Sequence, residues 1–304
     1  MTHTVLPGFQ DAHVHLALFD ATALRSAGIA RVVDLGGWLP DTGRPERIID
    51  IDIEIDCAGQ FLTAPGGYPS RQSWTPPSSV CAVSTPTDAA AAVDRQVAAG
   101  ASVIKVTLNS LAGPVLSTDV LDAILARAHA HGLPVVAHTE GSGQATRAFA
   151  AGVDVLAHAP FSERLSDVEL AAMAGSITWI STLDIHGWGE YGPEFERAVD
   201  NVRRFHARGG RVLYGTDLGN GPLPVGLNHR EIEALMTAGF SADDVLRALT
   251  GRLAHAHGSV STRPVAETGS VTLIPGSQPH DRRAFVDWLC TARAVTPAEL
   301  EALR

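Results

Sequence analysis

The sequence predicts an α/β fold: a (β/α)8 barrel with a reduced accessory β element built from the chain termini. Segments typical of buried strands alternate roughly eight times with helical segments, which indicates parallel βαβ units. The chain has 304 residues, 45% of them hydrophobic, and barrels of this length fold around one core. No G-x-G-x-x-G motif opens the chain, so an open dinucleotide-binding sheet receives little support. We expect the barrel at residues 1–258 and an accessory strand and helix at residues 259–304.

The expected strands are short runs of apolar and β-branched residues bounded by glycine, proline or polar residues. Those of the barrel lie at residues 9–16, 30–35, 61–64, 103–108, 134–138, 153–158, 177–182 and 211–217. Residues 51–55 alternate apolar and acidic side chains, which predicts an exposed pairing segment. Residues 269–276 predict one further strand, packed outside the barrel.

The expected helices begin at capping residues and end at glycine. A helix over residues 87–100 begins at the N-cap Thr87, and one over residues 117–131 begins at Ser117 and ends before Gly132. The remaining helices are expected at residues 20–28, in a short segment ending at residue 49, and at residues 142–151, 167–174, 194–208, 229–238, 242–257 and 297–304.

Polar residues stand at the ends of several expected strands. His13 and His15 are two apart in a strand, so their imidazoles face the same side. Other strand ends carry Lys105, His138, His158 and Asp217. Taken singly, each histidine fits a packed core residue, the lysine an ion-pair partner and the aspartate a helix cap. Parallel barrel strands all end on one face, where barrel active sites lie, so we expect these side chains to meet there.

The single lysine of the chain is informative. Lysine and arginine together number 23, and Lys105 is the only lysine among them. Arginine cannot replace lysine where an amine must lose its proton and react, because the guanidinium group stays charged. The exception therefore indicates a chemical role for the amine.

Together these segments resemble the amidohydrolase superfamily of metal-dependent hydrolases, especially its lysine-bridged, prolidase-like and imidazolonepropionase-like branch. The resemblance spans residues 6–258 and rests on Pro7-Gly8-Phe9-x-Asp11-x-His13-x-His15, Gly100-Ala101-x-x-Ile104-Lys105-Val106, Val135-Val136-Ala137-His138, Ala151-Gly152-Val153-Asp154-x-x-x-His158, Gly215-Thr216-Asp217 and Gly239-Phe240-Ser241-x-x-Asp244-Val245-Leu246-Arg247-Ala248-Leu249-Thr250.

The resemblance implies a centre of two divalent metal ions, with zinc expected and manganese, iron or cobalt also compatible. It places His13, His15 and Asp217 on one metal and His138 and His158 on the other. Lys105, carboxylated by CO2 to a carbamate, would bridge them. The implied activity is hydrolysis of an amide or cyclic amide, an N-acyl amino acid or a dipeptide. A metal-bridging hydroxide would attack, with Asp217 as general acid and base.

Two departures from the superfamily pattern bear on substrate and accessory structure. Many relatives carry Gly-Gly-His after the third strand, where this chain has Gly66-Gly67-Tyr68. Only residues 1–12 precede the H-x-H pair, so the accessory β-sandwich of the superfamily is expected to be reduced.

Other activities stay open. A deaminase is disfavoured because His138-Thr139-Glu140 departs from the H-x-x-E pattern and because the lysine is present. Lactonase or phosphotriesterase activity would use the same metal centre. A pseudoenzyme that binds metal and ligand without turnover is the alternative of another class, which the full ligand set disfavours.

Loops after the barrel strands supply the candidate substrate contacts. They are Tyr68, Arg71, Trp74, Asn109, His186, Trp188, Tyr191 and Asn220. We rank His186 first, because Gly187 beside it permits a tight loop.

Charge and cysteine content limit the classes of binding partner and the cellular location that we expect. The net charge is −10 with the signs interspersed, so no basic face for nucleic acid or anionic lipid is expected. No membrane span or signal peptide is expected either. The three cysteines form no C-x-x-C motif, which favours reduced thiols and a cytoplasmic location. We expect a small-molecule substrate, and a homo-oligomer is compatible with the sequence.

Overall fold

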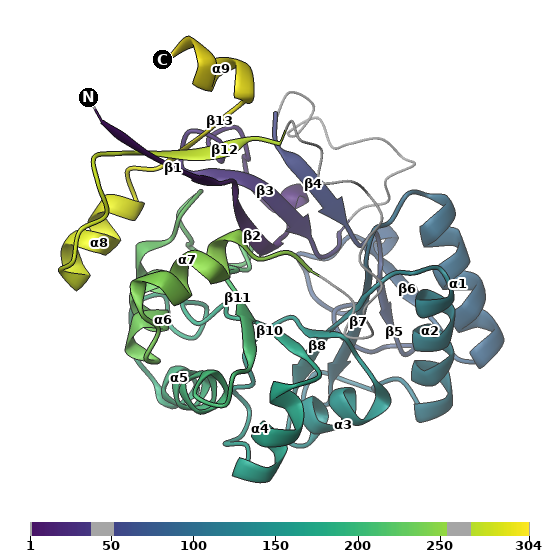
Figure 1. Cartoon of the computed structure of the whole chain (residues 1–304). Helices are drawn as coiled ribbons and strands as arrows, with labels where there is room; N and C mark the ends of the chain where they lie inside the picture. Colours follow the sequence, from purple (N-terminus) through teal and green to yellow (C-terminus); the bar gives the residue numbers. More distant parts are fainter. Residues whose placement is uncertain (1, 38–51, 254–268, 304) are drawn as a thin grey trace.

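Two parallel sheets form the centre of the molecule in the computed structural model, which describes residues 2–37, 52–253 and 269–303. Helices lie outside these sheets (Figure 1). The larger sheet has seven strands, in the order β11 (Arg211–Leu213), β10 (Thr178–Ile180), β9 (Val155–Leu156), β8 (Val135–Glu140), β7 (Ile104–Asn109), β5 (Phe61–Thr63) and β6 (Val80–Ala82). The smaller sheet contains β2 (Phe9–Val14), β3 (Ile29–Asp34) and β4 (Glu54–Cys57).

Backbone hydrogen bonds join both edge strands of the smaller sheet, β2 and β4, to the larger sheet. On one edge the Asp217 amide donates to the His13 carbonyl over 2.8 Å, and Val14 forms a parallel bridge with Leu218. On the other edge the Ser102 amide donates to the Cys57 carbonyl over 2.9 Å. The strands therefore follow one another around a common centre, as in a barrel.

Asp11 strengthens the junction between the first strand and the segment after β11. One carboxylate oxygen accepts from the Thr216 amide over 3.0 Å and from the His13 amide over 3.0 Å. The other oxygen accepts from the Thr216 hydroxyl over 2.5 Å. Asp11 is fully buried, so these bonds replace the water that the carboxylate loses on folding.

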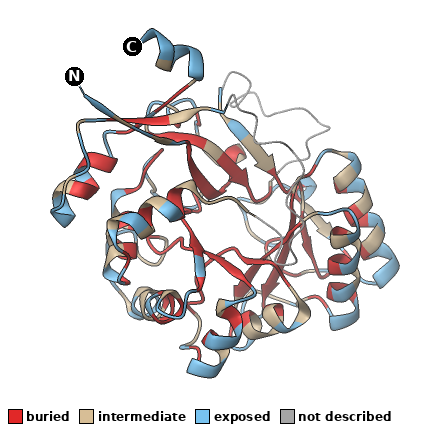
Figure 2. Cartoon of the chain, viewed as in Figure 1, coloured by how far each residue is buried: buried red, intermediate tan, exposed pale blue. Residues whose placement is uncertain are grey.

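The helices bury the sides that face the strands and expose their outer sides (Figure 2). Their bounds are α1 (Pro86–Ala98), α2 (Thr118–Ala130), α3 (Gln144–Ala151), α4 (Asp167–Ala174), α5 (Pro193–His206), α6 (His229–Thr237) and α7 (Ala242–Thr250). Reciprocal capping boxes begin α4, between Ser166 and Glu169, and α7, between Ser241 and Asp244. The stacked rings of Trp179 and Phe205, 3.8 Å apart, fix α5 on β10.

A small antiparallel sheet outside the barrel brings the two chain ends together (Figure 1). β12 (Val271–Pro275) lies between β1 (His3–Pro7) and β13 (Arg293–Val295), next to α8 (Arg282–Leu289) and α9 (Pro297–Ala302). A Cβ atom on Gly8 would lie 2.4 Å from the Ser270 carbonyl oxygen, so glycine permits the close backbone approach there. This sheet is the reduced accessory element that the sequence predicts.

Two expectations about local structure are wrong. Residues 20–28 form turns rather than a helix, after the short 3-10 helix η1 (Leu16–Leu18), and these turns place Leu24 in the hydrophobic core. The first long helix is capped by Thr85, not Thr87: the Thr85 hydroxyl accepts from the Asp88 amide, and Pro86 fits the first turn.

Other expectations differ in extent. The pairing segment expected at residues 51–55 is β4, which ends at Cys57. The sequence reading also lacked β1, β6, α8 and β13, which are three to eight residues long. The short helix expected to end at residue 49, the boundary at residue 258 and the last four residues of the expected helix 242–257 lie outside the described residues.

Candidate active site

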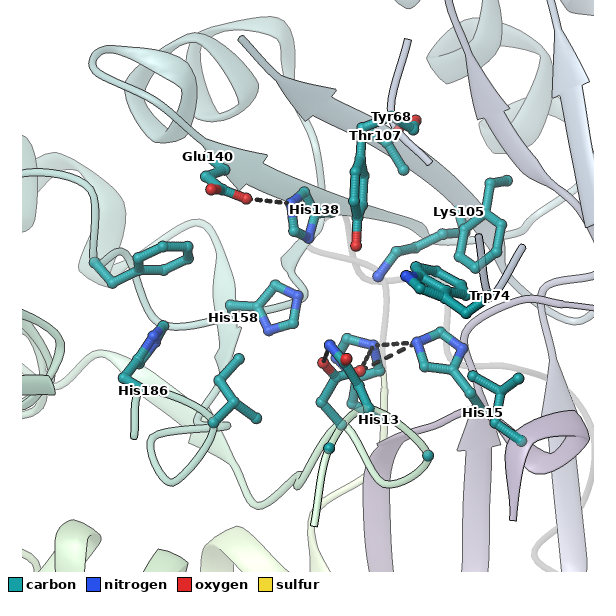
Figure 3. A pocket seen from close by; sticks show the side chains of 18 of the residues that line it. His13, His15, Tyr68, Trp74, Lys105, Thr107, His138, Glu140, His158 and His186 are labelled. Carbon is teal, nitrogen blue, oxygen red and sulfur yellow. Dashed lines mark hydrogen bonds and ion pairs between the residues drawn. The ribbon is translucent and has the colours of Figure 1, made fainter. Parts of the chain in front are cut away.

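His13, His15 and Asp217 meet at the carboxyl ends of the first and last barrel strands (Figure 3). The Nε2 atoms of His13 and His15 lie 3.0 and 3.1 Å from the same Asp217 oxygen, Oδ1. The two Nε2 atoms are 3.3 Å apart. All three side chains are buried, so three potential ligand atoms face one another away from bulk water.

Backbone carbonyls fix the orientation and tautomer of both imidazoles. His13 Nδ1 lies 2.9 Å from the Ala157 oxygen, and His15 Nδ1 lies 2.8 Å from the Gly36 oxygen. Because a carbonyl only accepts, each Nδ1 carries the hydrogen and each neutral ring presents an Nε2 lone pair. Such a carbonyl partner on the opposite ring nitrogen is typical of metal-binding histidines.

His138 and His158 complete a cluster of four imidazoles. The ring centroid of His158 lies 4.8 Å from that of His13 and 4.9 Å from that of His138. His158 Nδ1 bonds the Thr182 hydroxyl over 2.9 Å, and His138 Nε2 lies 3.3 Å from a Glu140 oxygen. Each ring therefore has one nitrogen held by the protein and the other nitrogen available.

Burial favours the neutral imidazole at three of the four histidines, His13, His138 and His158. Burial alone would also lower the pKa of His15, but its hydrogen bond to Asp217 and the charge of that carboxylate raise it. Loss of water lowers the pKa of His13 and His158 well below the usual histidine value. Burial alone would raise the pKa of Asp217, but the imidazoles of His13 and His15 hold it well below its usual range. A carboxylate among imidazoles is a donor set that suits a divalent transition metal.

Lys105 extends from β7 toward this cluster (Figure 3). Its side chain is 2% exposed, and it forms no ion pair with any residue that the structure describes. Burial lowers the pKa of its amine to about 7, although Asp217 acts in the opposite direction. A large share of the amine is therefore neutral at physiological pH.

The cluster forms the floor of a cavity of about 570 Å³. Its wall contains the predicted contacts Tyr68, Trp74, His186, Trp188 and Asn220. Asn220 donates from its amide to Asp217 Oδ2 over 2.9 Å. The imidazole of His186 packs on Phe161, and its Nε2 has no hydrogen-bond partner among the described residues.

Three predicted substrate contacts do not line the cavity. Asn109 is buried below it and donates to Glu140 over 2.6 Å. Arg71 is exposed, and its guanidinium lies over Gly66. Tyr191 is 68% exposed and packs on Phe195 at the surface. The sequence places these residues on the correct loops, but side-chain direction depends on how each loop folds back.

The structure adds lining residues that the sequence reading lacked: Leu18, Phe61, Thr107, Glu140, Phe161 and Ile185. Glu140 and Thr107 had a recognisable signal. Glu140 is two residues after His138 in β8, and Thr107 is two residues after Lys105 in β7. In a strand this spacing places both on the same side as the candidate ligands.

In the part of the chain that the structure describes, three non-glycine residues adopt left-handed backbone conformations, and all three lie at this site. Their φ angles are 40° for Thr182, 50° for Trp188 and 60° for Asp217. Such conformations are uncommon, especially for a β-branched residue such as threonine, and they concentrate at functional sites. Here they direct the Thr182 hydroxyl to His158 and the Asp217 carboxylate to His13 and His15.

A family comparison agrees with this geometry. The model of the Amidohydrolase family matches residues 4–260, which include every residue of the cluster. The chain belongs to the amidohydrolase family. No curated protein matches the sequence significantly.

Solved structures show the same fold as this amidohydrolase. A Xaa-Pro dipeptidase with bound methionine is 19% identical, with a TM-score of 0.71, over 97% of this chain and 85% of that one. A molinate hydrolase is 15% identical, with a TM-score of 0.69, over 96% and 82%. Phenylurea hydrolase B is 14% identical, with a TM-score of 0.69, over 99% and 87%. The predicted α/β barrel class is thereby confirmed, and the family assignment makes the protein a hydrolase.

Within the described residues, no helix is long and apolar enough to cross a membrane.

Proposed function

We propose that this amidohydrolase is a metal-dependent hydrolase that cleaves a C–N bond of an amide. One observation carries the proposal: Asp217 Oδ1 and the Nε2 atoms of His13 and His15 lie within 3.3 Å of one another. When both rings are neutral with Nδ1 protonated, none of these three atoms carries a hydrogen to share. Three buried lone-pair donors at such distances favour a shared cation.

The donor set fits two divalent ions. His13, His15 and Asp217 would hold one ion, and His138 and His158 would hold the other, with zinc expected and manganese, iron or cobalt compatible. When bound, the ions would polarise the scissile carbonyl and lower the pKa of a water molecule to near neutrality. The protein supplies preset ring orientations through Ala157, Gly36 and Thr182.

Lys105 would join the two halves of the centre as a carbamate. The neutral amine would attack CO2, an N–C bond forming at Nζ as one C–O π bond breaks, and one proton would leave, giving a carbamate whose single negative charge is shared by two oxygens. The support is the complete burial of Lys105, its position beside the imidazole cluster and its lowered pKa. Guanidinium cannot undergo this reaction, which agrees with the single lysine of the chain.

Proton transfer falls to Asp217. Its Oδ1 faces the imidazoles, while its Oδ2 is held by the Asn220 amide. The carboxylate can take a proton from the attacking water and deliver it to the nitrogen that leaves. Tyr68, whose phenol pKa is raised by burial, stays protonated and can donate to the substrate carbonyl oxygen.

The names of the structural neighbours, a dipeptidase and hydrolases of molinate and phenylurea, support hydrolysis in general and leave the leaving group open. Lactonase, phosphotriesterase or deaminase activity is the second candidate, since the same donor set serves those reactions.

The test combines metal analysis with product detection. Protein purified without chelator should contain about two equivalents of transition metal per chain. It should release an amine from at least one member of a panel of aryl amides, cyclic amides, N-acyl amino acids and dipeptides, followed by mass spectrometry. Bound metal without turnover of any amide, lactone or phosphotriester would instead favour a non-catalytic metal-binding protein.

A further inference from the structure

The charges around the cavity are unevenly distributed. Two acids, Glu140 and Asp217, line it, and Lys105 is the only lysine or arginine among the lining residues that the structure describes. Lys105 lies on the floor beside the imidazole cluster, where the proposed function uses its amine. Among the residues that the structure describes, the wall therefore offers no lysine or arginine to an anionic substrate group.

Two arginines near the cavity are engaged elsewhere, and a third is exposed. Arg230 bonds both oxygens of Asp184 from Nε, and its Nη2 lies 2.8 Å from one of them. Arg197 donates from Nε to the Phe161 carbonyl over 2.8 Å, and neither arginine lines the cavity. Arg71 is exposed on the loop beyond Tyr68.

Apolar and aromatic side chains make up the wall above the imidazoles. They are Leu18, Phe61, Trp74, Phe161, Ile185 and Trp188. Trp74 is 37% exposed and Trp188 is 44% exposed. Exposed tryptophans at a pocket are typical of sites that bury an apolar ligand group.

Glu140 adds a second negative charge to the lining of the cavity, besides that of Asp217. Figure 3 shows it above His186, with its carboxylate held at one oxygen by His138. The same oxygen, Oε2, accepts from the Asn109 amide over 2.6 Å. These two bonds hold the carboxylate at the cavity, where its charge opposes an anionic ligand. His186 offers an unpartnered nitrogen beside it, which suits a neutral hydrogen-bonding group.

We propose that the cavity selects amides with an uncharged or cationic apolar substituent and rejects amides that carry an anionic group on it. This inference rests on the proposed function, whose metal centre it uses as the cleavage point. An anionic group would lose water against Trp188 and Ile185 without gaining a cationic partner, and it would face Glu140. Free dipeptides and N-acyl amino acids, which carry a carboxylate, are thereby disfavoured.

Three matched anilides test the proposal on metal-loaded protein. Acetanilide is neutral, 4-acetamidobenzenesulfonate is anionic, and 4-acetamidophenyl-trimethylammonium is cationic. Sulfonate and quaternary ammonium groups are poor metal ligands and both withdraw electrons from the ring. Binding is measured by calorimetry and cleavage by release of the aniline. We expect the sulfonate to bind at least about tenfold more weakly than the other two.

Two variants at one position supply the matched control. Trp188→Arg adds a cation at the cavity wall and should reduce the discrimination against the sulfonate at least about fivefold. Trp188→Gln removes the same ring without adding charge and should leave the ratio of sulfonate to acetanilide affinity unchanged.

The outcomes separate this inference from the proposed function. Equal binding of sulfonate and acetanilide by the unaltered protein would overturn the inference, as would failure of all three anilides to bind. If the expected order of binding holds while no anilide is cleaved, charge selection stands and amide hydrolysis is the part that fails.

Discussion

The phenol ring of Tyr68 stacks on the imidazole of His138, with ring centroids 4.8 Å apart and planes inclined by 23°. The Thr107 hydroxyl donates to the Tyr68 carbonyl and fixes the backbone at this point. Figure 3 shows the phenol directed into the pocket between His138 and Lys105. Tyr68, which follows Gly66-Gly67, therefore presents a hydroxyl to the pocket beside His138 and Lys105.

Replacement of Tyr68 by phenylalanine keeps the stacked ring and removes the hydroxyl. We expect kcat to fall about 10²-fold with unchanged metal content, because one preset donor to the developing oxyanion is lost. Steady-state kinetics and elemental analysis measure the two effects. Tyr191→Phe, at an exposed tyrosine outside the cavity, is the control and should change neither. A Tyr68→Phe protein with normal kcat would assign the phenol to packing alone.

Asp217→Asn replaces the proposed proton acceptor with an amide of the same shape. We expect kcat to fall by about 10²–10⁴, because an amide cannot carry the proton between water and leaving nitrogen. One metal should also bind more weakly, since the anionic donor of its site is lost. The exposed Asp287→Asn protein controls for loss of a negative charge. Retention of full activity by Asp217→Asn would exclude this residue as the general acid and base.

Lys105→Arg keeps the positive charge but cannot form a carbamate. We expect it to lose one or both metals and nearly all activity. Lys105→Ala should regain part of its metal content and part of its activity when a short carboxylic acid such as propionate is added, because the acid can fill the bridging position. Metal content, activity and the carbonyl carbon resonance after ¹³CO2 labelling provide three readouts. Normal metal binding and turnover in Lys105→Arg would contradict the carbamate.

Glu231 gives a pH-dependent prediction away from the metals. It is fully buried, and burial raises the pKa of its carboxyl to about 7, although the Asp184 amide donates to it. Between pH 4.5 and 7 the folded protein keeps a proton that the unfolded chain has lost. The free energy of unfolding should therefore fall as pH rises through this range, by on the order of 3 kcal/mol.

Glu231→Gln should remove that part of the slope. Urea denaturation of the metal-free protein at several pH values, for both proteins, isolates the contribution of this carboxyl. Parallel curves for the two proteins would show that Glu231 titrates alike in the folded and unfolded states.

The strand-end residues could be predicted because strand geometry and barrel topology act locally and uniformly. Alternation along a strand aligns His13 with His15, and parallel strands bring His138, His158 and Asp217 to one face. Whether these residues bind metal stays a prediction. The direction of Arg71 could not be predicted in the same way, because it depends on the path of a loop over residues distant in sequence.

Pairing between residues distant in sequence likewise limits how much of the fold could be predicted. β1 has few apolar residues and becomes a strand because β12 pairs with it, Val5 opposite Leu273. The turn conformation at residues 20–28 likewise follows from packing of Leu24 into the core. The secondary-structure propensity of a short segment carries no information about the distant residues with which it pairs or packs.

The bonds between Asp11 and Thr216 span 205 residues of sequence. During synthesis, the first strand emerges from the ribosome long before its partner exists, and the Asp11 carboxylate must stay hydrated until residue 216 has followed. Ring completion is thus a late, non-local event that slows folding and leaves a growing chain with an open sheet edge. A C-terminal truncation before residue 216 should expose that edge and increase binding by chaperones. Removal of the same number of residues from the N-terminus would instead delete the first strand.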